Sequence, residues 1–86
     1  MRLENKSLLG FDFGILPNGD GWVISFATPN FNDNIWRRGL DREKILNQWR
    51  NFIKDRKVFE LSSNSIDALQ DDLIEIFSEF HKSLKS

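Results

Sequence analysis

The strongest hydrophobic pattern in the chain lies at its C-terminal end, in residues 65–84. Apolar residues recur there at intervals of three and four, the spacing that gathers side chains on one face of an α-helix. They are Ile66, Leu69, Leu73, Ile76, Phe77, Phe80 and Leu84. Acidic residues occupy every fourth position of the opposite face, from 67 to 79. The pattern predicts one long amphipathic helix whose N-cap is Asn64 or Ser65.

Two segments near the N-terminus alternate between apolar and polar residues, which is typical of β-strands. Residues 9–15 form the first and residues 22–28 the second, and an Asn-Gly loop at 18–19 separates them. This arrangement predicts a β-hairpin. Residues 1–7 are polar and are expected to be a short leader before the first strand. The face predicted to join the core carries Phe11, Phe13, Trp22, Ile24 and Phe26.

The middle of the chain predicts a second helix, from an N-cap at Asp41 to about Lys57. Its apolar stripe consists of Ile45, Leu46, Trp49, Phe52 and Ile53. Residues 30–40 are rich in Asn and Asp, so they form either a loop or a third short strand. Residues 58–61 alternate and are β-prone, so a further strand is expected there.

These elements define an α+β fold. We expect an antiparallel sheet of three or four strands with two helices packed on one face, in the order β-β-(β)-α-β-α. The 86 residues leave room for a single domain, residues 1–86. Eight Phe and three Trp supply large buried surfaces for a chain of this size.

Composition removes several classes of function. The chain has no Cys, so disulfides and thiolate metal sites are excluded. The N-terminal residues lack the apolar core of a signal peptide, and no apolar run is long enough to cross a bilayer. We therefore expect a soluble, cytoplasmic protein with no membrane partner.

Catalytic groups are sparse. The single His, His81, is predicted to sit at the boundary of the last helix's apolar face, and no Cys or Tyr can serve as a nucleophile. One His and scattered acids do not make a metal site. A carboxylate mechanism using Asp12 and Asp20 is the one enzymatic alternative. We expect a non-enzymatic protein with no catalytic residue, no metal and no cofactor.

Charge is distributed unevenly although the whole chain carries a net charge of −1. Residues 36–57 hold eight Arg or Lys against three Asp or Glu, whereas residues 58–86 hold six acids against two Lys. A basic segment is thus followed by an acidic one, and each suggests a different partner.

The acidic residues of the last helix favour a protein partner. An acidic surface steers basic partners and can mimic the phosphates of nucleic acids. The predicted function is a small protein-binding inhibitor: an immunity protein, an antitoxin or a phage-type counter-defence factor that docks on a basic nuclease, toxin or nucleic-acid-binding effector. The predicted contact residues are Asp67, Asp71, Asp72, Glu75 and Glu79. The structural alternative is a solvated outer face, answered in part by the chain's own basic helix.

The basic segment favours an alternative function, an accessory domain that binds RNA or DNA. Arginine for phosphates and an aromatic ring for base stacking are the groups that such binding needs. The candidate residues are Trp36, Arg37, Arg38, Arg50, Lys54 and Lys57. Trp36 would be the one free stacking group, because Trp49 and Phe52 fall on the apolar stripe. An ordinary charged helix face is the structural alternative.

The last helix also leaves open a homodimer. Its apolar residues follow the spacing of a coiled-coil seam over fewer than three heptads. They are Ile66, Leu69, Leu73, Ile76 and Phe80.

Overall fold

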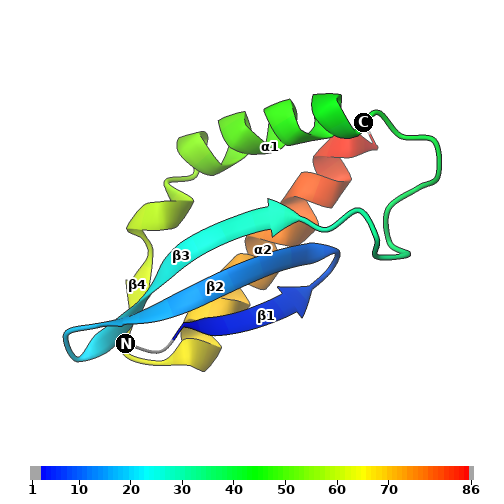
Figure 1. Cartoon of the computed structure of the whole chain (residues 1–86). Coiled ribbons are helices and arrows are strands. Elements are labelled where there is room, and N and C mark those ends of the chain that lie inside the picture. The colour runs from blue at the N-terminus through cyan, green and yellow to red at the C-terminus, as the bar shows by residue number, and fades with distance from the viewer. Residues whose placement is uncertain (1–2, 86) are drawn as a thin grey trace.

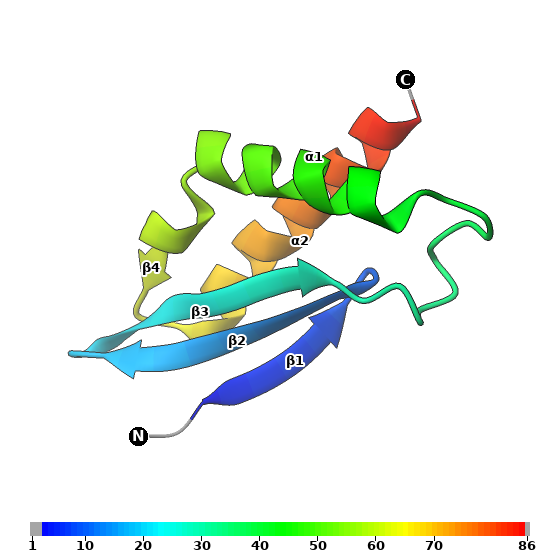
Figure 2. The ribbon, with the colours of Figure 1, turned by 45° about the horizontal axis from the view of Figure 1, so that its top comes forward.

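A computed structural model describes residues 3–85 of the chain (Figure 1). Four antiparallel strands form one sheet in the order β1-β2-β3-β4, and the elements follow one another as β-β-β-α-β-α. Both helices lie on the same face of the sheet (Figure 2). The predicted α+β class is confirmed. The elements are β1 (Glu4–Leu8), β2 (Phe11–Asn18), β3 (Gly21–Pro29), α1 (Arg42–Asp55), the 3₁₀ helix η1 (Val58–Glu60), β4 (Ser62–Ser63) and α2 (Ile66–Leu84).

Two tight turns connect the first three strands. Leu9 and Gly10 join β1 to β2 with φ values of 53° and 80°, and a two-residue type I′ turn requires positive φ at both positions. Gly19 opens the turn between β2 and β3 with φ of 61°. The predicted hairpin is confirmed, and its turn is shorter than the Asn- and Gly-rich loop suggested.

Strand β1 corrects the prediction of a polar leader. Residues 4–8 pair in full with β2, with Glu4 opposite Ile15 and Leu8 opposite Phe11. The strand lies at the edge of the sheet, where polar and charged side chains are tolerated, so its sequence carries little strand signal. Residues 1 and 2 of the predicted leader lie outside the described residues.

A β-bulge in β3 corrects the prediction for Phe26. Gly14 pairs with Phe26 but Ile15 pairs with Ile24, so Ser25 is an extra residue in β3. This extra residue moves Phe26 to the outer face of the sheet, away from the helices. Its ring lies over Gly14 so closely that a Cβ built on Gly14 would be 2.4 Å from Phe26 Cε1.

Asp41 caps α1 as predicted, and Ser65, one of the two predicted candidates, caps α2. The Asp41 carboxylate accepts a hydrogen bond from Lys44 N at 3.2 Å, and Ser65 Oγ accepts one from Ala68 N at 3.3 Å. The predicted apolar face of α2 is confirmed, because its members are buried or packed against the core. Trp49 is the buried residue of α1, and its Nε1–H donates to the carbonyl of Ala27 in β3 at 2.9 Å.

The core is aromatic and lies between the sheet and the two helices. The Phe11 ring stacks on Phe77 of α2 at a centroid distance of 4.3 Å and lies 4.5 Å from the Trp49 ring. The residues that line this layer and are buried are Phe11, Phe13, Ile15, Ile24, Ala27, Trp36, Trp49, Val58, Leu69, Leu73, Phe77 and Phe80.

The segment between β3 and α1 is a loop of turns. Of the two alternatives predicted for residues 30–40, a loop or a short strand, the loop is the one that the structure has. The side chains of Asn30 and Asp33 accept hydrogen bonds from the backbone N–H groups of Asn32 and Ile35, at 3.1 and 2.9 Å. Such local bonds hold the backbone in turns and compete with strand pairing.

The strand predicted at residues 58–61 is wrong. Lys57 adopts φ of 53°, which turns the chain sharply after α1 and sends Val58 into the core within a 3₁₀ turn. Strand pairing begins only at β4, where Ser62 and Ser63 meet Val23 and Trp22 of β3.

Candidate functional site

Helix α2 presents its acidic residues outward because its other face is buried. Leu69, Leu73 and Phe77 are fully buried against the sheet, so positions on the opposite side of the helix face solvent. Asp67, the first of the acids, lies in the first turn, where the helix dipole favours a negative charge.

Four of the five predicted contact residues, Asp67, Asp71, Asp72 and Glu75, are exposed. Within residues 3–85 none of these four carboxylates forms an ion pair or accepts a hydrogen bond. At 1.5 Å of rise per residue they span about 12 Å of helix. We call these four residues the acidic face of α2.

Glu79 behaves differently from the acidic face. Its Oε2 accepts a hydrogen bond from Arg56 Nε at 3.1 Å and lies 2.9 Å from Arg56 Nη2, so the two side chains form an ion pair. The Arg56 guanidinium also lies over the Phe52 ring, 4.6 Å from its centroid. Glu79 therefore joins α2 to the end of α1, and the structure separates it from the acids with which it was grouped.

Trp36 is not a free stacking group. It is 7% exposed, and its Nε1–H donates to the Gly10 carbonyl at 2.8 Å. Its ring packs against Phe11 and His81 at centroid distances of 5.4 and 4.5 Å. The expectation that Trp36 stacks on bases is wrong, because the ring closes the core beneath the loop.

The basic residues of the alternative site are exposed but divided between two regions. Arg37 and Arg38 lie in the loop before α1, whereas Lys54 and Lys57 lie at its far end, about 20 Å away along a helix of 14 residues. Arg50 lies between them and donates to Asn47 Oδ1 at 3.0 Å. The five basic side chains are thus exposed, but Trp36, the aromatic ring predicted to act with them, is buried.

The predicted dimer seam is not available on the surface. Leu69 and Leu73 are 0% exposed and Phe80 is 1% exposed, because all three pack in the core of the same chain. A coiled-coil dimer through this face is therefore excluded for the folded chain. Asp12 and Asp20 do not meet either, since Asp12 pairs with Thr28 at the base of the hairpin and Asp20 lies in the turn at its tip.

His81 lies at the boundary of the α2 core face, as predicted. Its Nε2–H donates to the Leu9 carbonyl at 2.7 Å, which ties the end of α2 to the β1–β2 turn. Sequence reasoning missed a cavity of about 660 Å³ beside it, formed by the loop before α1, the start of α1 and the end of α2. No sequence signal marks it, because its walls come from three separate segments.

Two further observations concern chemistry and location. Among residues 3–85, no three His, Cys, Asp or Glu side chains are grouped closely enough to hold a metal ion. Neither helix of that part of the chain combines the length and the apolar character needed to cross a membrane.

Comparison of the chain with protein-family models, with curated proteins and with solved structures finds no significant match.

Proposed function

We propose that this protein is a small non-enzymatic inhibitor that binds a basic protein partner through the acidic face of α2. The supporting observation is that Asp67, Asp71, Asp72 and Glu75 are exposed carboxylates with no cationic partner among the described residues. An immunity protein, an antitoxin and a phage-type counter-defence factor are the roles that fit such a protein. The partner would be a basic nuclease, toxin or nucleic-acid-binding effector.

The acidic face carries an energetic cost within its own helix. Like charges four residues apart destabilise a helix by about 0.2–0.5 kcal/mol per pair. Asp67, Asp71 and Glu75 form two such pairs, and in residues 3–85 no Lys or Arg lies within ion-pair distance of them. A cationic surface on a partner would remove this repulsion, so binding and relief of the repulsion favour the same complex.

The acidic face is also held rigidly. Leu69 and Leu73, on the opposite side of the same turns, are fully buried in the core. A surface that keeps one shape loses little conformational entropy on binding. Negative charge concentrated on such a surface accelerates encounter with a basic partner.

Binding of RNA or DNA through Arg37, Arg38, Arg50, Lys54 and Lys57 is the alternative. It has less support, because Trp36 is buried and no longer supplies a stacking ring.

The experiment compares two matched double charge reversals. Asp71→Lys with Glu75→Lys reverses an i,i+4 pair of α2, and Arg50→Glu with Lys54→Glu reverses an exposed i,i+4 pair of α1. Each tagged variant and the wild type are used to capture partners from a lysate of the source cell. The proposal expects a basic protein that the wild type and the α1 variant retain and that the α2 variant loses, with affinity lowered roughly tenfold or more.

A second measurement addresses the alternative function. Binding of single-stranded RNA and DNA is titrated at about 50 mM salt and again at higher salt, because phosphate contacts weaken steeply as salt rises. Salt-dependent binding that the α1 variant loses and the α2 variant keeps would replace the inhibitor proposal with the nucleic-acid one.

A further inference from the structure

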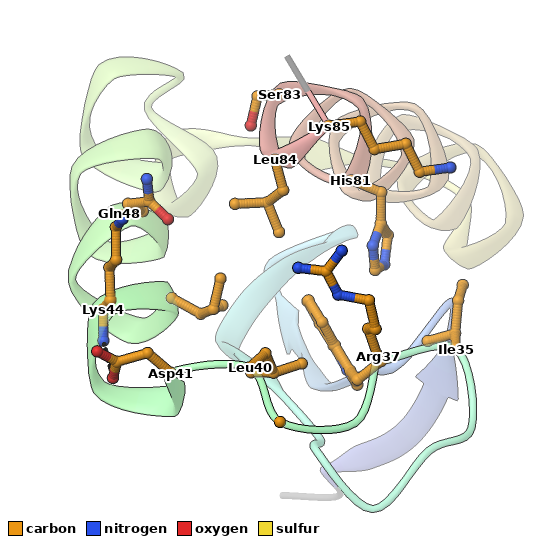
Figure 3. Close-up of a pocket in the computed structure, with 13 residues that line it drawn as sticks. Ile35, Arg37, Leu40, Asp41, Lys44, Gln48, His81, Ser83, Leu84 and Lys85 are labelled. Atoms are coloured by element: carbon orange, nitrogen blue, oxygen red, sulfur yellow. Dashed lines mark hydrogen bonds between the residues drawn. The ribbon is translucent and has the colours of Figure 1, made fainter.

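The end of α2 lies beside the start of α1 at one end of the molecule (Figure 1). The cavity of about 660 Å³ is lined by residues of both these helix ends and of the loop before α1 (Figure 3). Its size falls within the range of about 300–1,000 Å³ that is typical of small-molecule sites. It is separate from the acidic face, because none of the acidic residues of α2 lines it.

One part of the cavity wall is apolar. Leu40 comes from the loop, Ile45 from the second turn of α1 and Leu84 from the last turn of α2. Trp36 also lines the cavity, and its ring is fixed by the hydrogen bond to the Gly10 carbonyl. A cavity whose apolar side chains are held in place by the fold provides a preformed surface for an apolar group.

The rest of the lining carries an excess of positive charge. Arg37, Lys44 and Lys85 line the cavity, and Asp41 is the single carboxylate. The Asp41 carboxylate already accepts a hydrogen bond as the N-cap of α1. The Arg37 guanidinium points into the cavity (Figure 3) and forms no ion pair or hydrogen bond with any residue between 3 and 85. Its guanidinium donors thus face a cavity that has both apolar and cationic walls.

We propose that this cavity binds a small organic carboxylate that has an apolar body. Arg37 forms paired hydrogen bonds with the carboxylate, a geometry that guanidinium favours over the point charge of lysine. Lys44 adds positive charge at the rim. The apolar body packs against Leu40 and Leu84. This site is independent of the proposed inhibitor function, since the two use different residues.

The test uses 4-phenylbutyrate as the probe and 4-phenylbutan-1-ol as its neutral counterpart. Indole N–H resonances of the 15N-labelled full-length protein report binding. Trp36 lines the cavity, and Trp49, whose indole donates to Ala27, does not and serves as the internal reference. We expect a saturable shift at Trp36 and none at Trp49, with a Kd on the order of 1 mM for a ligand of this size. The alcohol should bind roughly tenfold more weakly, because it lacks the charge that Arg37 pairs with.

Two matched pairs of variants locate the site. Arg37→Gln is compared with Arg38→Gln, its exposed neighbour outside this cavity. Gln48→Glu places a carboxylate in the lining without changing the size of the side chain, and Asn51→Asp makes the equivalent change one turn further along α1, outside it. Arg37→Gln and Gln48→Glu should each weaken phenylbutyrate binding roughly tenfold, and the two controls should retain it. All four side chains are exposed, so thermal unfolding should confirm that each variant folds.

Three results would overturn the proposal. They are the absence of a saturable shift at Trp36, equal binding of the acid and the alcohol, and equal effects of the Arg37 and Arg38 variants. None of these results bears on the acidic face, so the inhibitor proposal stands or fails separately.

Discussion

The two halves of α2 carry similar sequence patterns but make different contributions to the molecule. In the first half, Asp67, Asp71 and Glu75 extend into solvent and contact no cation among the described residues. In the second half, Glu79 pairs with Arg56 and His81 donates to the Leu9 carbonyl. Acids at the same helical spacing thus have different roles, because among them only Glu79 lies within ion-pair distance of a cation of the described residues. The candidate partner surface is confined to the first half.

The largest loss of stability is expected at Trp36, which connects the second half of α2 to the loop before α1 and to the β1–β2 turn. We expect Trp36→Ala to lower the free energy of unfolding by about 3–5 kcal/mol, since it opens a cavity and removes the hydrogen bond to Gly10. Trp36→Phe keeps most of the volume and should cost less. Urea denaturation followed by circular dichroism measures both. A cost below about 1 kcal/mol for the Ala variant would mean that Trp36 does not hold this end of the molecule.

The β1–β2 turn beneath Trp36 provides the second test. Gly10→Ala should be destabilising by about 1–3 kcal/mol, because φ is 80° and the new Cβ would lie 2.4 Å from Ile35 Cγ2 and 2.6 Å from Trp36 Nε1. Gly19→Ala is the control, since Gly19 also has positive φ but no atom within 4 Å of a built Cβ. Thermal unfolding of the two variants separates crowding from backbone strain. An equal decrease in the unfolding temperature of the two variants would show that the close packing at Gly10 does not contribute to stability.

The ion pair between Glu79 and Arg56 is expected to contribute less to stability than Trp36 or Gly10. The side chains are 41% and 48% exposed, so solvent screens the pair and we expect a coupling energy of only about 0.2–1 kcal/mol. A double-mutant cycle of Arg56→Ala and Glu79→Ala measures it. Arg56→Ala should cost more than Glu79→Ala, because it also removes the contact with Phe52. The opposite order would contradict this assignment of contacts.

The smallest change in the free energy of unfolding is expected in the first half of α2. There the substitution should stabilise the fold, whereas the others destabilise it. Asp71→Asn removes two like-charge pairs, so the free energy of unfolding should rise by about 0.4 kcal/mol at low salt, the lower end of the range for two such pairs. The same change should weaken capture of the basic partner, whereas Glu79→Gln should leave capture intact. If Asp71→Asn destabilises the fold, the acidic face has an internal role and the proposed function loses its support.

Much of the fold follows from local sequence patterns. The cap at Asp41, the cap at Ser65 as one of two candidates, the apolar face of α2 and the glycine turn at Gly19 agree with the predictions. Each depends on residues within a few positions of one another, where steric and hydrogen-bonding preferences act without knowledge of the rest of the chain. The spacing of four residues likewise placed the acidic residues of α2 on one face of the helix.

The tertiary structure decided the features that depend on distant segments. The polar residues of β1 form a strand because β2 offers them a free edge, and the bulge at Ser25 moves Phe26 to the outer face. Burial of Trp36, the separation of Glu79 from the other acids and the cavity beside His81 arise where three or four segments meet. The sequence by itself determined the helices, the hairpin and the charges that they carry. Only packing determined which charges remain free and which aromatic ring is buried, because both depend on neighbours that are far away in the chain.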